Sequence, residues 1–162
     1  MTDRIRPDVR RIETPEEMHR FGIDLAAELR AGDVVVLTGP LGAGKTGLTR
    51  GIGEGLKVRG PVTSPTFVLA RTHPSLIAGP PLVHVDAYRL SSAVELDDLD
   101  IDFPRSIVVI EWGAGMLDGI VDSWLELVIA RPTGATHVEQ TDDAGVEPRT
   151  VTIAPHGPRW GQ

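Results

Sequence analysis

The segment "DVVVLTGPLGAGKTGLTRGIGEGL", residues 33–56, gives the clearest structural signal in the chain. Its first six residues are continuous and mostly β-branched, which predicts a strand buried on both faces. After a glycine-rich loop, Leu48, Ile52 and Leu56 recur every four residues, which predicts a helix. Glycine occupies seven of these positions (39, 42, 44, 47, 51, 53 and 55), although it is a poor helix former. Helix formation alone therefore does not account for this composition.

The loop itself matches a phosphate-binding motif. Residues 39–46, "GPLGAGKT", fit G-x-x-x-x-G-K-[ST] between a predicted strand and a predicted helix, the context that a P-loop requires. Glycines let backbone N–H groups point at an anion, and the helix N-terminus adds its positive dipole end. Lys45, one of two lysines in the chain, would reach the β- and γ-phosphates, and the Thr46 hydroxyl would bind Mg²⁺. The residues expected to hold the nucleotide here are Gly39, Leu41, Gly42, Ala43, Gly44, Lys45, Thr46 and Gly47.

Two further predicted strands end in carboxylates. The apolar part of "PLVHVDAYRL" ends at Asp86, and that of "SIVVIEW" ends at Glu111. If both strands run parallel to the first, both side chains emerge at the sheet edge where the loop lies. P-loop sites need such a carboxylate to hold Mg²⁺ or its waters. The alternatives are a solvated strand-end acid for Glu111, and a turn cap or an ion pair with Arg89 for Asp86.

The rest of the chain predicts one α/β domain over residues 1–162 with a mixed sheet. Thr14 as N-cap, Pro15 at the first helical position and Glu17 in a capping box predict a helix that Gly32 ends. A short acidic helix is expected over residues 93–99. The later strands are expected in "TFVLARTH", "PLVHVDAYRL", "RSIVVIEWG", "SWLELVIAR" and "RTVTIAP", the last two forming an antiparallel hairpin at one sheet edge. We expect residues 1–13 to form a disordered tail and residues 132–148 a mobile acidic loop.

Composition narrows the functional classes. Of 162 residues, 41% are apolar and 24% are charged, and no apolar run is long enough to span a bilayer. The chain has no cysteine and five scattered histidines, which argues against disulfides and zinc. With no secretory signal recognisable, we expect a cytoplasmic protein that binds no membrane. The net charge of −7 and dispersed basic residues argue against direct binding to DNA or RNA, so any tRNA would be reached through a partner.

Four segments together resemble a known family. "GPLGAGKT", "VTSPTF", "HVDAYRL" and "VVIEWG" occur in the order and approximate spacing of the TsaE (YjeE) family, the bacterial ATPase subunit of tRNA threonylcarbamoyladenosine biosynthesis. The similarity extends over about residues 14–131, with a weaker match in "RTVTIAP". By itself the "VTSPTF" stretch is consistent either with a nucleotide-responsive loop or with a turn that enters a strand.

The resemblance implies a fold, a reaction and partners. It implies a P-loop NTPase three-layer sandwich with a mixed, mostly parallel central sheet and a C-terminal antiparallel hairpin. It also implies Mg²⁺-dependent ATP hydrolysis in a complex with TsaB and TsaD subunits, of which TsaD transfers the threonylcarbamoyl group. The residues that it implicates in catalysis are Lys45, Asp86 and Glu111, with Thr46, Asp86 and Glu111 as metal ligands. Those that it implicates in nucleotide binding beyond the loop are Thr63, Ser64, Thr66 and Trp112, although Trp112 is equally consistent with core packing.

The chain departs from the family pattern in its loop. Family members usually read "GDLGAGKTT", whereas this chain has Pro40 in place of the acid and Gly47 in place of the second threonine. Gly47 removes a hydroxyl beside the expected phosphate site and weakens the first helical turn, which bears more on hydrolysis than on nucleotide binding. The acidic segment between the last two strands is also longer than usual, and no role is assigned to it.

Three alternative functions follow from the P-loop alone. A GTPase would need an Asn-Lys-x-Asp loop to recognise guanine, and the chain contains no asparagine. A small-metabolite kinase would need a lid with catalytic arginines and an acceptor pocket, and neither is evident from the sequence. A nucleotide-gated adaptor with incidental hydrolysis would bind its partners without needing rapid turnover.

Overall fold

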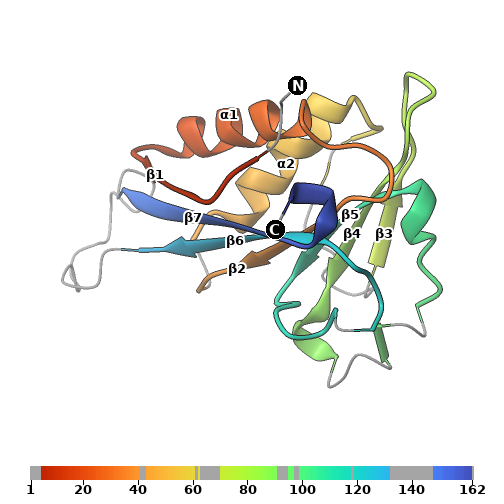
Figure 1. Ribbon diagram of the computed structural model, residues 1–162. Helices are drawn as coiled ribbons and strands as arrows, with labels where there is room; N and C mark the ends of the chain where they lie inside the picture. Colours follow the sequence, from red (N-terminus) through yellow and green to blue (C-terminus); the bar gives the residue numbers. More distant parts are fainter. Residues whose placement is uncertain are drawn as a thin grey trace.

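The computed structural model describes residues 5–40, 43–60, 62, 70–90, 95–96, 99–117, 119–131 and 148–161. Its seven strands form one sheet in the order β1-β7-β6-β2-β5-β4-β3 (Figure 1). The strands are β1 (Asp8–Ile12), β2 (Val34–Thr38), β3 (Ala70–His73), β4 (Leu82–Asp86), β5 (Ile107–Glu111), β6 (Trp124–Ala130) and β7 (Arg149–His156). The helices are α1 (Pro15–Ala26) and α2 (Lys45–Leu56), with 3-10 turns η1 (Ala87–Arg89), η2 (Phe103–Arg105) and η5 (Pro158–Trp160).

The sheet is mixed, as predicted. The pairs β2–β5, β2–β6 and β4–β5 are parallel, whereas β1–β7, β6–β7 and β3–β4 are antiparallel. Five strands therefore run in one direction, and only β3 and β7 run in the other. The strand β2 lies at the centre with Val34 to Leu37 fully buried, which confirms the strand expected from the apolar run.

The C-terminal hairpin of β6 and β7 is also confirmed, but it does not lie at the sheet edge. Strand β1 covers it, pairing antiparallel with β7 from Asp8 to Ile12. The prediction of a disordered tail over residues 1–13 is therefore wrong for these five residues. The strand was missed because only Ile12 in it is buried, so its sequence lacks an apolar pattern. Pairing with β7 satisfies backbone N–H and C=O groups whatever the side chains are.

The helices α1 and α2 lie side by side on one face of the sheet (Figure 1). They approach so closely that a Cβ on Gly51 would overlap the carbonyl oxygen of His19, and one on Gly55 would lie 2.6 Å from the Cβ of Ala26. Two glycines of the opening segment are thus explained by helix packing. The core between helices and sheet includes Met18, Phe21, Leu25, Leu48, Ile52, Val35, Leu37, Val109, Leu125 and Leu127.

The opposite face of the sheet carries a second apolar cluster. It contains Val34, Val36, Val83, Val85, Val108 and Ile110. Within the described residues, the third layer over this cluster consists of short segments that supply Ala87, Leu90, Leu96 and Leu117. No helix in the described part of the chain is long and apolar enough to cross a membrane.

Helix α1 begins as predicted and ends earlier. The Thr14 hydroxyl oxygen accepts the N–H of Glu17 at 3.1 Å, which confirms the N-cap. The Glu17 carboxylate accepts the N–H of Glu13 at 2.8 Å, one residue before the position that a capping box requires. The helix ends at Ala26 rather than at Gly32: the N–H groups of Glu28 and Leu29 bond to carbonyls three residues back instead of four, and the Glu28 carbonyl accepts a bond from Arg159 at 3.0 Å.

Several predicted elements have different bounds. The strand expected in "PLVHVDAYRL" ends at Asp86, because the Asp86 carboxylate caps the turn η1 by accepting the N–H of Tyr88 at 3.0 Å. Of "TFVLARTH", only Ala70–His73 is described, and it forms β3. Most of the acidic helix expected over residues 93–99 lies outside the described residues, although Glu95 and Leu96 are helical. Residues 132–147 of the expected acidic loop also lie outside them.

Candidate functional site

The glycine loop connects the end of β2 to the start of α2. Gly44 is the N-cap of α2 and has a φ of 112°, a left-handed conformation that favours glycine. A Cβ on Gly39 would lie 2.7 Å from the carbonyl oxygen of Ile129, so no larger residue fits there. Leu41 and Gly42 lie outside the described residues. The glycines at both ends of the loop are therefore required by its geometry.

Lys45 is the central side chain of the site. It is only 6% exposed, and its Nζ donates to the carbonyl oxygens of Gly39 at 2.6 Å and Pro40 at 3.0 Å. The same Nζ lies 4.4 Å from the centre of the Trp112 ring, a cation–π distance. Burial lowers the pKa of Lys45, and the nearby Glu111 and Asp86 carboxylates oppose this shift. The cation is thus held beneath the loop by carbonyl dipoles and an aromatic face.

The two carboxylates lie side by side at the carboxyl ends of their strands. Glu111 on β5 is in register with Leu37 on β2 and with Asp86 on β4, and all three strands are parallel. The predicted meeting of Asp86 and Glu111 beside Lys45 is therefore realised in the structure. Glu111 is 5% exposed. Asp86 also caps η1. Its role as a turn cap, which the sequence left open, is therefore compatible with a position at the site.

Trp112 lies at the site rather than deep in the core. It is half-buried, and its ring contacts both Lys45 and the Tyr88 ring, whose centre is 5.4 Å away in an edge-to-face arrangement. Its φ of 65° is rare for a residue with a side chain, and its N–H donates to the Leu37 carbonyl at 3.1 Å. β5 ends at this turn, and Leu117 beyond it packs in the apolar cluster on the face of the sheet opposite the helices.

The remaining loop residues are placed as follows. Ala43 is buried, and Thr46 is half-buried in the first turn of α2. A Cβ on Gly47 would have no atom within 4 Å, so packing does not require glycine at the position where the chain departs from the family pattern. Thr63, Ser64 and Thr66 lie outside the described residues.

Two residues that the sequence analysis did not single out also contact the site. His84, fully buried on β4, places its Nε2 2.7 Å from an oxygen of Glu111. Arg149, the first residue of β7, donates from Nε to the Ala43 carbonyl at 3.1 Å. His84 lies two residues before Asp86, and the alternation of a strand puts both on one face. That alternation was the available signal for His84, whereas nothing local indicated Arg149.

The donor groups suit Mg²⁺ bound together with phosphates. Among the described residues, no three His, Cys, Asp or Glu side chains gather as a metal cluster. Protein Mg²⁺ sites commonly use one or two carboxylates and leave the remaining positions to water and substrate phosphates. Glu111 and Asp86 provide carboxylate oxygens, and Thr46, in the first turn of α2, provides a hydroxyl oxygen. The buried Lys45 ammonium group near these carboxylates could form charge-assisted hydrogen bonds with phosphate oxygens.

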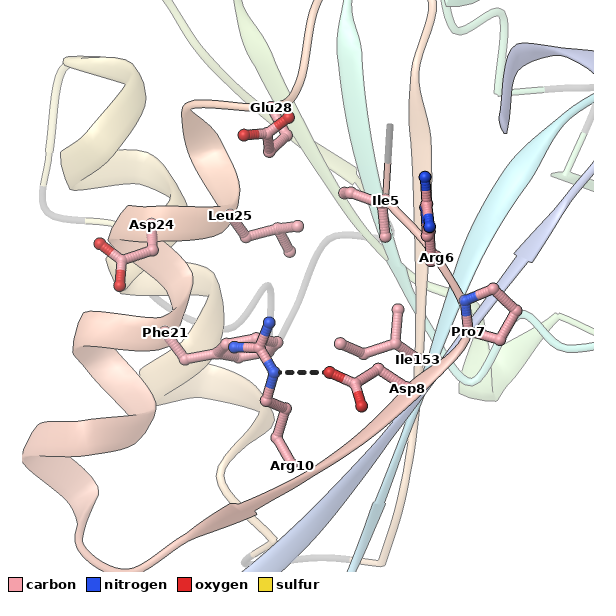
Figure 2. A pocket seen from close by; sticks show the side chains of 10 residues that line it. All are labelled: Ile5, Arg6, Pro7, Asp8, Arg10, Phe21, Asp24, Leu25, Glu28 and Ile153. Atoms are coloured by element: carbon pink, nitrogen blue, oxygen red, sulfur yellow. Dashed lines mark hydrogen bonds and ion pairs between the residues drawn. The ribbon is translucent and has the colours of Figure 1, made fainter. Parts of the chain in front are cut away.

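A groove elsewhere on the molecule contains none of the predicted site residues. It encloses about 660 Å³ between the N-terminal segment and α1. Figure 2 shows Phe21 and Leu25 of α1 facing Ile153 and Ile5 across it, with Arg10 bonded to Asp8 at 2.9 Å. Basic and acidic side chains are mixed along its rim, so it shows no preference for an anion.

A G-x-x-x-x-G-K-T loop between a central strand and a helix, with carboxylates on the neighbouring strand ends, is the arrangement of P-loop nucleotide-binding proteins. The family model described as threonylcarbamoyl adenosine biosynthesis protein TsaE matches residues 12–139. The chain therefore belongs to the TsaE family, as the four sequence segments indicated.

Relatives of the chain support this assignment. The tRNA threonylcarbamoyladenosine biosynthesis protein TsaE of Streptomyces coelicolor is 54% identical over 146 residues, covering 88% of this chain and 93% of that protein. Its Bacillus subtilis counterpart is 32% identical over 153 residues, covering 93% and 87%. The crystal structure of Bacillus subtilis YdiB has a TM-score of 0.68 at 26% identity and covers 98% of this chain and 90% of that one.

Proposed function

We propose that this protein is a Mg²⁺-dependent ATPase that supports tRNA threonylcarbamoyladenosine modification by acting on a complex of TsaB- and TsaD-type subunits. The observation that carries the proposal is the position of Lys45, Asp86 and Glu111, which lie close together beside the glycine loop, where the parallel strands end. Family membership supports the pathway, and the motif chemistry supports the reaction.

Lys45 would bind the nucleotide phosphates. Its ammonium group donates hydrogen bonds to the carbonyls of Gly39 and Pro40. An incoming phosphate chain would replace these carbonyls as the acceptor. The N-terminus of α2 adds free N–H donors at the same place. Because Lys45 is buried, its charge is poorly screened by water and acts strongly on the transferring phosphoryl group.

The two acids would divide the remaining work. Glu111 and the Thr46 hydroxyl would hold Mg²⁺, which when bound neutralises charge on the phosphate oxygens. Asp86, half-buried beside Glu111, would orient the attacking water and accept its proton. The two carboxylates are adjacent, so the opposite division of roles is the other arrangement that the same site allows.

The test measures phosphate release from ATP by the purified protein, with Mg²⁺, alone and with the TsaB- and TsaD-type subunits. We expect slow turnover alone and faster turnover with the subunits. Lys45→Ala should abolish turnover and weaken nucleotide binding, because the loop loses its buried cation. Lys57→Ala is the matched control, since it removes the other lysine of the chain, which is exposed at the far end of α2. Unchanged ATP turnover in Lys45→Ala would overturn the proposal.

The same assay separates the alternative functions. Labelled phosphate that appears on a small metabolite rather than as free phosphate would favour a kinase. Binding of the subunits that is indifferent to nucleotide, with no stimulation of turnover, would favour an adaptor. Either result would contradict the ATPase proposal.

A further inference from the structure

We propose that His84 is a positioning residue for Glu111, and that its ring determines how much Mg²⁺ increases the affinity of the protein for its nucleotide. The inference rests on the proposed function, because it assigns Glu111 to the metal. It concerns a fully buried side chain that acts only through the carboxylate beside it.

The contact is short and fully buried. The Nε2 of His84 lies 2.7 Å from Oε2 of Glu111, and the two side chains are 0% and 7% exposed. A buried carboxylate loses its water shell and needs a hydrogen-bond donor in exchange. His84 is the donor that the described residues supply to Glu111. The bond therefore offsets the cost of burying Glu111 and restricts its rotation.

The other ring nitrogen fixes which atom carries the proton. Nδ1 of His84 is buried and has no hydrogen-bond partner in the described part of the chain. A neutral imidazole carries one N–H, and that N–H is most stable on the nitrogen that faces an acceptor. The proton therefore sits on Nε2 and is donated to Glu111.

The fold places this pair with little freedom. His84 is inside β4, flanked by Val83 and Val85, and both neighbours point to the opposite face of the sheet. Glu111 is the last residue of β5, and its Oε2 is taken by His84. The second oxygen, Oε1, then remains for a ligand at the sheet edge. A histidine that holds one oxygen of a carboxylate is the kind of outer partner that tunes metal affinity, typically by 10- to 100-fold.

The experiment compares three variants of the full chain. His84→Leu removes the donor at similar volume, and His84→Gln keeps an N–H near the position of Nε2. His73→Leu is the matched control: His73 is also buried, and it pairs with Leu82 on the neighbouring strand, which puts it on the same face of the sheet. The Nδ1 of His73 lies 3.3 Å from the Arg59 carbonyl oxygen, and in the described part of the chain His73 forms no hydrogen bond with Glu111.

The readout is the affinity for an ATP analogue that is not hydrolysed, measured with EDTA and then with Mg²⁺. In His84→Leu, binding with EDTA should match the wild type, because the loop and Lys45 are intact, while the gain from Mg²⁺ should fall about tenfold or more. His84→Gln should recover most of that gain, and His73→Leu should keep all of it. Thermal unfolding of the variants distinguishes a loss of stability from a loss of the Mg²⁺ effect on nucleotide binding.

A second readout does not depend on the nucleotide. Nitrogen-15 NMR of the histidine rings should show His84 as the Nε2–H form, and Glu111→Gln should shift that signal. A full Mg²⁺ gain in His84→Leu, an equal loss in His73→Leu, or an Nδ1–H form of His84 would each overturn the inference. If the NMR signature is present but the wild type binds no ATP, the proposed function fails, and with it the link to Mg²⁺.

Discussion

Four of the glycines in residues 39–55 lie inside α2, and their surroundings in the structure differ. Gly51 and Gly55 allow α1 to approach, and a Cβ on Gly53 would lie 2.7 Å from a methyl group of Val62. Gly47 has no neighbour that would exclude a side chain. At three positions the helix propensity lost to glycine is offset by close packing, whereas at Gly47 no packing contact offsets it.

This difference predicts opposite effects of the same substitution. Gly47→Ala should stabilise the protein by a few tenths to about 1 kcal/mol, because alanine favours the helix and the added methyl meets nothing. Gly51→Ala should destabilise it by about 1–3 kcal/mol, because the methyl would push α2 from the backbone of His19. Urea denaturation of the two variants measures both values. Loss of stability in Gly47→Ala would contradict this prediction, because the backbone at Gly47 is helical and has no positive φ.

At the scale of elements, the C-terminal turn η5 is tied to the start of β2. Arg159 donates to both carboxylate oxygens of Asp33, at 2.8 and 3.1 Å, and to the Glu28 carbonyl at 3.0 Å. The Asp33 side chain is 3% exposed and that of Arg159 is 21% exposed. The guanidinium also stacks on Trp160, with its central carbon 4.0 Å from the ring centre. One side chain therefore joins the end of α1, the start of β2 and the end of the chain.

Breaking this contact should cost much more than breaking an exposed ion pair. Arg159→Met leaves the buried Asp33 carboxylate without its cation, and we expect a loss of about 2–4 kcal/mol in unfolding free energy. Arg105→Met is the control, because Arg105 and Asp102 are 3.9 Å apart and their side chains are 85% and 55% exposed. That variant should change stability by less than about 0.5 kcal/mol. Similar values for both variants would show that the buried pair contributes little.

At the scale of the whole molecule, the elements that were predicted best from the sequence are those with a continuous run of buried apolar residues or a complete sequence motif. The strands β2 and β5 each contain an uninterrupted apolar run, and the loop between β2 and α2 has a motif whose chemistry constrains its glycines, its lysine and its threonine. Strand β1 was missed because an exposed edge strand held by backbone bonds has no hydrophobic signature. The short segments of the third layer were equally hard to foresee, since they bury single residues rather than a periodic face.

The candidate site also contains residues that the sequence predicts and a residue that it does not. The positions of Lys45, Asp86 and Glu111 near one another could be predicted because motif spacing and strand ends indicate where such side chains emerge. His84 was overlooked because a histidine in an apolar strand resembles a core residue, and its contact with Glu111 depends on the register between β4 and β5. Local sequence does not specify that register. Contacts between strands far apart in the chain are therefore where structure adds most to the sequence.

Global stability should also carry a pH dependence from His73. Burial lowers the pKa of His73; its contact with the Arg59 carbonyl opposes that shift, and the nearby His84 and Arg71 reinforce it. Its Nε2 is buried without a hydrogen-bond partner among the described residues, so the folded state favours the neutral ring. In the unfolded chain the ring binds a proton near pH 6.5. Between that pH and the lower folded pKa, the unfolded state holds more protons, so acidification favours unfolding.

The unfolding free energy of the wild type should therefore fall as the pH drops below about 6.5, by at most about 1.4 kcal/mol per pH unit from this group. His73→Leu lacks the titrating ring, so its stability should fall less over the same range. The measurement is urea denaturation of both proteins at half-unit steps from pH 7.5 to 5. Carboxylates titrate in both proteins, so the difference between the two curves isolates His73. Parallel curves would show that the folded protein accepts a proton on His73 as readily as the unfolded chain does.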